Sequence, residues 1–246
     1  MPLLSVAIIT RDEAPRIARC IASVAFADEI VVLDSGSTDD TVAIARAAGA
    51  RVEIATDWRG FGVQKNRALE RCSGDWIIAL DADETVTPTL AVAIQGALTQ
   101  PAACWGARRV STFLGHEMRW GDWRGDVVWR LFPRGQARYS ERLVHEDLVT
   151  TLPRRLLAGG LAHETYRSLA DVREKSERYA ELGARELHAR GRRVTGTGAT
   201  LRAAWAFARC YLLRAGFLDG SAGLQLAKMQ AAVTWGKYSR LRRLTR

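Results

Sequence analysis

Short apolar runs alternate with amphipathic stretches along the first hundred residues. Apolar residues recur at helical spacing between the runs, which predicts helices over 13–24, 41–50 and 63–72. Strands that alternate with helices of this length indicate βαβ units and a mostly parallel sheet, and helices on both faces explain why its strands are continuously apolar. Strands are predicted at 5–10 (SVAIIT), 29–34 (EIVVLD), 51–56 (RVEIAT) and 76–80 (WIIAL).

The pattern changes near residue 101. The following segments are short, rich in aromatic residues and broken by Gly and Pro, which predicts a small mixed or antiparallel second part with long loops. A charged amphipathic helix is predicted over 168–191, and two further helices over 200–238. The sequence therefore predicts an α/β fold with a C-terminal helical appendage.

Charge is distributed unevenly along the 246 residues. The net charge is +9, but residues 200–246 hold nine Lys or Arg and one acid, Asp219, so the remainder is close to neutral. No apolar run reaches the length of a membrane-spanning helix, and the first residues lack the features of a secretory leader, so we expect a cytoplasmic protein. Four scattered cysteines without a C-x-x-C pair favour reduced thiols over a zinc site or disulfides.

Carboxylates follow several of the predicted strands. Asp12 and Glu13 follow the first strand, Asp34 ends the second, and Asp81 and Asp83 follow the fourth. Ligands of parallel sheets bind at the carboxyl ends of the strands, and an Asp-x-Asp turn can direct two hard oxygens at Mg²⁺ or Mn²⁺ holding a diphosphate. Alternatively, Asp81 caps the next helix and Asp83 is a solvated loop residue.

The same segments carry a family resemblance. Thr10-Arg11-Asp12-Glu13, the stretch DSGSTDDT (34–41) and Asp81-Ala82-Asp83 resemble the strand ends of inverting family 2 glycosyltransferases, which read T-x-N-E, D-x-S-x-D-x-T and D-x-D. The resemblance covers roughly residues 4–100 and implies a Rossmann-like GT-A fold. Asp12 stands where the family usually has Asn, so the local hydrogen bonds should differ, because a carboxylate cannot donate as an amide does.

A narrower resemblance spans most of the chain. It rests on softer motifs at 57–69, 142–146, 161–168 and 211–227, which look like those of bacterial lipopolysaccharide inner-core β-glucosyltransferases. It implies metal-dependent transfer of a hexose, glucose, from a UDP-sugar to a heptose of the core. Transfer to a polyprenyl phosphate or to another cell-surface glycan, nucleotidyl transfer and a non-catalytic binding module are the alternatives.

The resemblance divides the chain into three parts and assigns donor-site residues. Residues 1–100 would form the nucleotide-sugar half of the GT-A domain, 101–167 the acceptor half, and 168–246 a helical, basic region. Lys65 could reach a phosphate as a point charge, or it is an ordinary solvated helix lysine. Asp83 would be the main metal ligand, and the nucleotide-sugar site would include Thr10, Asp12, Glu13, Asp34, Asp81 and Ala82. Glu84, next to this motif, is expected to face the helix that starts near Pro88.

Inversion requires a base for the acceptor hydroxyl, and the stretch VHED offers one. Glu146 is the preferred base and Asp147 the other candidate, unless both are exposed acids at a strand end. His145 would orient the loop. His163 would be a further metal ligand by analogy with other GT-A enzymes, and imidazole suits Mn²⁺ better than Mg²⁺; alternatively, it is structural.

Aromatic and basic residues suggest where an acceptor and a membrane would bind. Trp120 and Trp123 could stack on sugar rings, and Arg124 and Arg130 could bind phosphates or carboxylates of the core, with ordinary packing as the alternative. The basic tail contains Trp205 and other aromatic residues, which favours the anionic inner face of the cytoplasmic membrane. Nucleic acid is disfavoured because no RNP, KH or helix-turn-helix signature is present, and packing of the tail against the catalytic domain is the remaining alternative.

Overall fold

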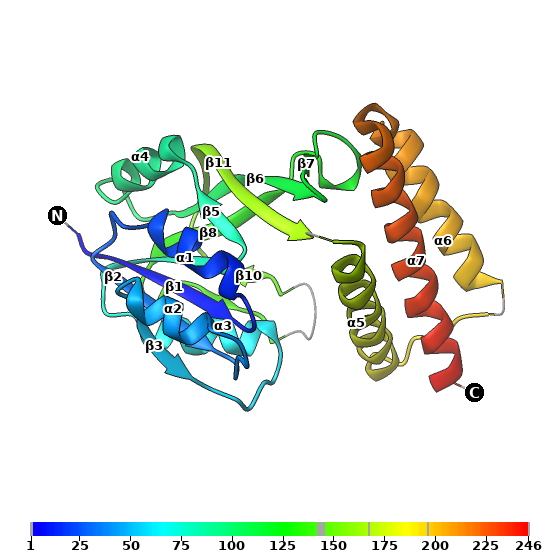
Figure 1. The fold of residues 1–246 in the computed structure, drawn as a ribbon, viewed down its shortest axis with the longest axis horizontal. Helices are drawn as coiled ribbons and strands as arrows, with labels where there is room; N and C mark the ends of the chain where they lie inside the picture. The colour runs from blue at the N-terminus through cyan, green and yellow to red at the C-terminus, as the bar shows by residue number, and fades with distance from the viewer. Residues whose placement is uncertain (1, 142–145, 167, 196, 246) are drawn as a thin grey trace. The chain divides into compact units, whose positions relative to one another are not determined.

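A sheet with parallel and antiparallel halves forms the first part of the molecule, and helices form the last (Figure 1). The computed structural model describes residues 2–141, 146–166, 168–195 and 197–245. The strands are β1 Leu4–Thr10, β2 Glu29–Asp34, β3 Arg51–Ile54, β4 Trp76–Asp81, β5 Glu84–Val86, β6 Cys104–Phe113, β7 His116–Glu117, β8 Val127–Pro133, β9 Arg138–Tyr139, β10 Leu148–Val149 and β11 Arg154–Tyr166. The helices are α1 Ala14–Ala22, α2 Thr41–Ala47, α3 Phe61–Glu70, α4 Pro88–Ala97, η1 Gly121–Trp123, α5 Leu169–Ala189, α6 Gly198–Ala208, η2 Arg209–Leu213, η3 Gly216–Asp219 and α7 Gly220–Leu244.

The sheet confirms the predicted fold class. Its order is β3-β2-β1-β4-β8-β6-β11-β5, parallel from β3 to β4 and antiparallel where β4 meets β8 and where β8 meets β6. Thr10 pairs with Asp34, and Ile9 pairs with Asp81. The carboxyl ends of β1, β2 and β4 therefore lie side by side, as expected for parallel strands.

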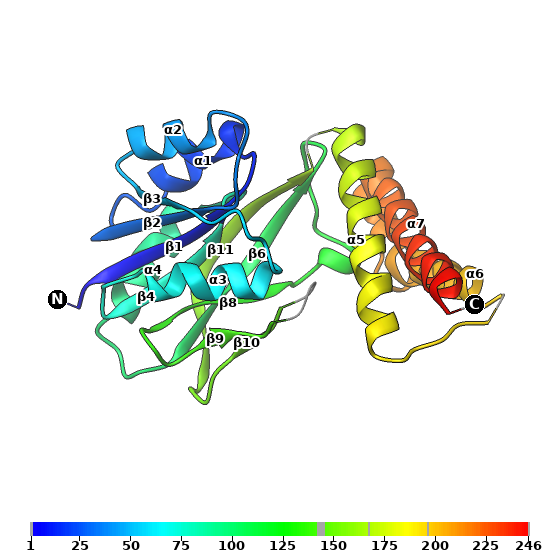
Figure 2. The ribbon, with the colours of Figure 1, turned by 90° about the horizontal axis from the view of Figure 1, so that it is seen from below.

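Apolar residues on alternate strand positions pack against different helices. One buried cluster joins even-numbered residues of β1, such as Val6 and Ile8, to α1, α2 and α4. The other joins Ala7 of β1 and Ile77 of β4 to α3 and to the β9–β10 hairpin. Figure 2 shows α1 and α2 on one side of the sheet and α3 on the other. Double coverage is the reason these strands have no polar face.

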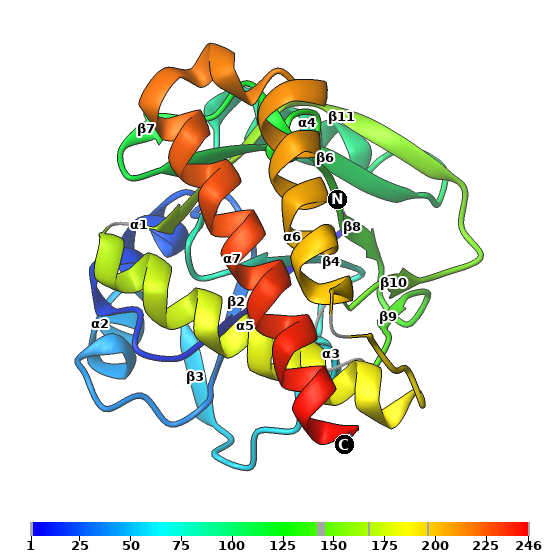
Figure 3. The ribbon, with the colours of Figure 1, turned by 90° about the vertical axis from the view of Figure 1, so that its right-hand side faces the viewer.

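The chain forms two compact units. Unit 1 comprises residues 1–109 and 126–163, and unit 2 comprises 110–125 and 164–246. In unit 2, α7 packs against α5 and α6 (Figure 3). The core of unit 2 contains Phe113, Met118, Tyr166, Cys210, Leu226 and Met229.

The cysteines and the apolar length of the helices complete the description of the fold. All four cysteines are buried and free, as predicted. Within the described residues, no helix combines the length and apolar character needed to cross a bilayer.

Candidate active site at the carboxyl ends of the parallel strands

Asp34 shapes the turn at the end of β2. Its carboxylate is buried and accepts hydrogen bonds from the backbone N–H groups of Gly36 (2.9 Å) and Ser37 (2.8 Å) and from the Ser37 hydroxyl. Thr10 is buried beside it at the end of β1, and the structure assigns its hydroxyl no hydrogen-bond partner among the described residues. Asp34 therefore fixes the turn after β2 through three hydrogen bonds.

Asp12 ties the turn after β1 to the turn after β2. Its carboxylate acts only as an acceptor, from the N–H (2.7 Å) and hydroxyl (3.1 Å) of Thr38. Its own N–H donates to the Ser37 hydroxyl (2.8 Å). Its φ of 54° lies in the left-handed region, where Asp and Asn are enriched because their short side chains bond locally. Glu13 follows, and its N–H donates to the Thr41 hydroxyl (2.7 Å), so the ends of β1 and β2 are tied together.

Asp81 is neutralised by cations of the protein itself. Lys65 Nζ lies 2.9 Å from Oδ1, and Arg130 Nη2 donates to Oδ2 at 2.6 Å. Burial would raise the pKa of Asp81, but Arg130, Lys65 and Arg109 outweigh it and hold this pKa well below its usual value. Asp81 therefore has its charge balanced by Lys65 and Arg130 without a metal ion.

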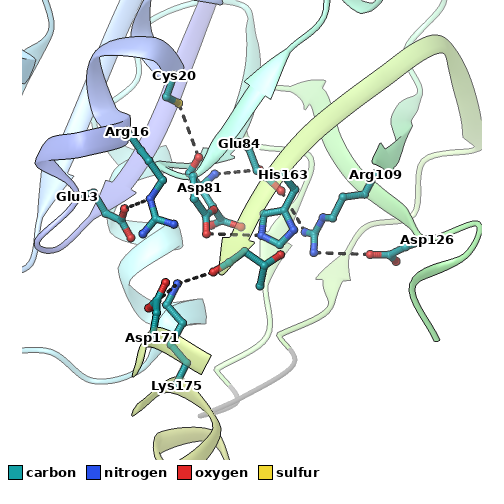
Figure 4. A network of polar contacts seen from close by, with 12 residues as sticks. Glu13, Arg16, Cys20, Asp81, Glu84, Arg109, Asp126, His163, Asp171 and Lys175 are labelled. Atoms are coloured by element: carbon teal, nitrogen blue, oxygen red, sulfur yellow. Dashed lines mark hydrogen bonds and ion pairs between the residues drawn. The ribbon is translucent and has the colours of Figure 1, made fainter. Parts of the chain in front are cut away.

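Glu84 is a site residue that sequence reasoning missed (Figure 4). The expectation that it faces the helix beginning near Pro88 is wrong: its fully buried carboxylate accepts from Arg130 (2.8 Å) and from the Asp81 N–H (2.9 Å) and lies 3.1 Å from Arg109. Arg130 also reaches the Tyr139 hydroxyl (3.4 Å). The sequence does contain a signal for this cluster: β6 includes Arg108 and Arg109 and β8 includes Arg130, and a buried cation requires a buried partner.

Lys65 connects Asp81 to the candidate base. Its Nζ lies 2.7 Å from Oε1 of Glu146, and the lysine side chain is only 6% exposed, so it is not a solvated helix residue. Although burial disfavours the ammonium, Asp81, Tyr139 and Glu146 raise the pKa of Lys65 above its usual value. Lys65 is therefore a permanent cation between the two carboxylates.

Helix α3 also holds the β9–β10 hairpin, whose loop carries Glu146. The Asn66 side chain donates to the Tyr139 carbonyl (2.9 Å) and accepts from the Tyr139 N–H (2.7 Å). Gly62, one turn earlier, lies so close to Ser140 that a Cβ built on it would be 1.9 Å from the Ser140 carbonyl oxygen. The Ser140 N–H donates to the Asp147 carbonyl (2.9 Å) and the Asp147 N–H donates to the Ser140 hydroxyl (3.0 Å), which closes the base of the loop. The position of Glu146 thus depends on α3.

Asp83 lies beside His163 of β11, which is labelled in Figure 4. His163 pairs in register with Glu84, and its Nε2 lies 3.5 Å from Asp83 Oδ2, with both side chains largely buried. One carboxylate oxygen and one imidazole nitrogen at this separation fit two positions of a divalent cation. No set of three or more potential metal ligands occurs in the parts of the chain that the structure describes. The remaining ligands would have to be water or substrate oxygens.

The other predicted site residues lie in both units. Ala82 is buried between the two aspartates, and His145 lies outside the described residues. In unit 2, the Arg124 guanidinium lies 4.1 Å from the centroid of Trp120, and Trp123 packs on Phe113 and Tyr166. The acceptor role of Trp120, Trp123 and Arg124, and that of Arg130 in unit 1, stays a prediction.

Known proteins similar to this chain point to one enzyme class. Residues 5–151 match the family described as Glycosyl transferase family 2. An uncharacterised glycosyltransferase of Rickettsia prowazekii (strain Madrid E) is 27% identical over 266 residues, which cover 100% of this chain and 88% of that protein. The lipopolysaccharide core biosynthesis glycosyltransferase LpsC of Rhizobium meliloti (strain 1021) is 34% identical over 153 residues, 59% of this chain and 57% of LpsC.

Among solved structures, the match covers a smaller part of the chain. Glucosyl-3-phosphoglycerate synthase from Mycobacterium tuberculosis, in complex with Mn²⁺, UDP and glucosyl-3-phosphoglycerate, is 30% identical with a TM-score of 0.39. The match covers 45% of this chain and 44% of the synthase, so it spans less than half of either protein.

Proposed function

The chain belongs to glycosyltransferase family 2, and from this membership we propose that it transfers glucose, with inversion, from a UDP-sugar to a heptose of the lipopolysaccharide inner core. The observation that carries the proposal is the Lys65 bridge: one buried ammonium holds both Asp81, at the donor end of β4, and Glu146, the candidate base. The similarity to LpsC over 153 residues supports the acceptor class.

The donor would bind along the strand ends. Thr10 and the Asp12–Glu13 turn would form one wall of the nucleotide pocket, with the turn shaped by Asp34 as its neighbour. Asp83 and His163 would hold Mn²⁺ or Mg²⁺, which supplies positive charge for the departing diphosphate. Asp81 is already held by Lys65 and Arg130, so its role would be to orient the turn and to contact the ribose.

Glu146 would take the proton of the acceptor hydroxyl as that oxygen attacks the anomeric carbon in line with the leaving UDP. A base acts only within hydrogen-bond reach of its proton, so the loop that carries Glu146 must be placed accurately. Lys65, Asn66 and Gly62 of α3 would provide that placement. Asp147 is the second candidate; its backbone N–H is engaged by Ser140.

A mass-analysed assay with a panel of UDP-sugars and truncated lipopolysaccharides would identify donor and acceptor. We expect a mass increase of one hexose with UDP-glucose and a heptose-terminated acceptor, dependent on added Mn²⁺ or Mg²⁺. Asp83→Asn should abolish both the turnover and its metal dependence. Unchanged turnover in this variant would rule out the proposed metal site.

Transfer to a polyprenyl phosphate is the second candidate, because it needs no strong base: its acceptor is already an anion. Glu146→Gln separates the two reactions. We expect turnover to fall by about 10² to 10⁴ for a hydroxyl acceptor, whereas near-normal turnover would favour a lipid phosphate and refute Glu146 as the base.

The proposed acceptor is attached to a lipid, so we further propose that the enzyme works peripherally on the anionic inner face of the cytoplasmic membrane. The excess of basic over acidic residues in 200–246 supports this location.

A further inference from the structure

An apolar stripe runs along the exposed side of α6 and η2. Leu201, Trp205, Leu212 and Leu213 are each 59 to 67% exposed. Leu201 and Trp205 are four positions apart on α6, so they share one face of that helix, and Leu212 and Leu213 follow in η2. Large apolar side chains grouped in one exposed segment, rather than scattered singly, are typical of a binding surface.

The stripe continues around the turn that leads into α7. Ala215 adopts a left-handed conformation (φ 54°), which reverses the chain between η2 and η3. Phe217 and Leu218 follow and are 49% and 55% exposed. In Figure 3 this turn lies at the end of the helical hairpin formed by α6 and α7. We call the six residues Leu201, Trp205, Leu212, Leu213, Phe217 and Leu218 the apolar edge.

Other aromatic residues of the tail contribute to packing instead. Phe207 and Tyr211 lie against the core of unit 2, with ring centroids 5.4 Å apart. Tyr238 lies under the Arg202 guanidinium at 4.8 Å. The aromatic residues of the tail therefore have two roles. Among the described residues of 200–246, large apolar groups are exposed in the apolar edge and at Trp235 and Leu244.

Basic residues predominate in the segment that carries the apolar edge. Asp219, the single acid of residues 200–246, is turned inward: its buried carboxylate accepts from the backbone N–H groups of Arg119 and Trp120. Asp122 of η1 is also largely buried and pairs with Arg209 at 2.6 Å. Arg202 follows Leu201 on α6 and is exposed. A protein partner would be matched by charges of both signs, whereas exposed cations beside apolar groups match an anionic lipid surface.

We infer that the apolar edge enters the interface of an anionic membrane, with the exposed Arg202 and Lys228 available to lipid headgroups. Bulky apolar groups between long basic side chains suit this position, because the rings and aliphatic groups leave water while the guanidinium and ammonium groups stay at the headgroups. The inference specifies the surface behind the proposed membrane location, and it rests on that part of the proposed function.

Vesicle sedimentation of the full-length chain tests the surface. We compare phosphatidylcholine vesicles with vesicles that also contain phosphatidylglycerol, and the double variant Leu212→Ser/Leu213→Ser with the wild type. We expect binding only to the anionic vesicles, weakened by added salt, and a loss of about tenfold or more in the double variant. Ile54→Ser/Val92→Ser is the matched control, because these two side chains of unit 1 are 56% and 70% exposed; its binding should equal that of the wild type.

Two further measurements separate the outcomes. A brominated lipid should quench Trp205, so that Trp205→Phe reduces the quenching while vesicle binding persists. Turnover of a water-soluble truncated acceptor without vesicles should be unchanged in Leu212→Ser/Leu213→Ser, so a failure of the proposed chemistry is distinguishable from a failure of the surface. Equal vesicle binding by both double variants would overturn the inference, as would self-association abolished by Leu212→Ser/Leu213→Ser without any vesicle binding.

Discussion

The charged cluster at the end of β4 and the basic helices of unit 2 use the same types of side chain in opposite environments. In the cluster, Lys65 and Arg130 are buried and each contacts two carboxylates at 2.6 to 2.9 Å. In residues 200–246, nine cations accompany one acid, and that acid is turned inward. The ion pairs of the β4 cluster act over short distances in a fixed geometry. The cations of residues 200–246 create a positive potential that extends over about a Debye length.

Buried, paired cations and exposed cations contribute differently to stability and to the attraction of ligands. A buried, paired cation contributes little net attraction for distant ligands, but its removal leaves carboxylates desolvated and unpaired. An exposed cation can be replaced with little effect on stability, while it still attracts an anionic surface. The cluster should therefore govern folding and placement of the site, and the helices should govern association.

The largest expected effect follows from removing a buried cation. Arg130→Met leaves Asp81 and Glu84 without their shared partner and should lower the free energy of unfolding by about 3 to 5 kcal/mol. Urea denaturation measures it. The matched variant Lys228→Met removes an exposed cation and should change stability by no more than about 0.5 kcal/mol. Similar losses in the two variants would refute the contrast between the regions.

Gly62→Ala changes no charge, so it tests whether packing, in addition to the Lys65 ion pair, positions the candidate base Glu146. Gly62→Ala would put a Cβ 1.9 Å from the Ser140 carbonyl oxygen, so the backbone leading to Glu146 must move. We expect kcat to fall by about 10²-fold, because a displacement of about 1 Å has that effect on reacting groups. Gly96→Ala on α4 is the control: its Cβ would meet nothing within 4 Å, and stability should rise by about 0.5 to 1 kcal/mol. Normal kcat in Gly62→Ala would show that α3 does not set the position of Glu146.

The smallest expected effect concerns Glu29. This acid is half-buried, so its environment is intermediate between the buried cluster and the exposed basic helices. Burial opposes ionisation of Glu29, but hydrogen bonds from Ser5 and Ser73 and from Arg51 lower its pKa to about 2. The unfolded chain binds this proton at higher pH than the folded chain does. The stability that Glu29 contributes is therefore complete above about pH 4.5 and is lost as the pH falls toward 2.

Denaturation at a series of pH values measures this dependence. Glu29→Gln cannot take up the proton, so its unfolding free energy should decrease less steeply between pH 4.5 and 2 than that of the wild type. Parallel curves for the two proteins would contradict the assignment of the acid limb to Glu29.

The sequence by itself determined the local elements and the place of the chemistry. Apolar runs and helical spacing predicted β2 at its observed bounds and the other parallel strands to within two residues at either end. Turn residues after β2 and the D-x-D after β4 identified the family and the edge of the sheet at which to look. These signals lie within a few neighbouring residues, so no tertiary information was needed.

Tertiary structure alone decided which charges meet. Arg130 contacts Asp81 and Glu84 across 49 and 46 positions of sequence, and Lys65 of α3 reaches a carboxylate beyond β9. A buried charge is stable only beside a partner, and the partner is supplied by the register of β4, β6 and β8, which no local pattern encodes. For the same reason Glu84, dismissed from sequence, proved to be buried at the centre of the cluster, and the aromatic residues of the tail separated into core and exposed edge only once α6 and α7 had packed.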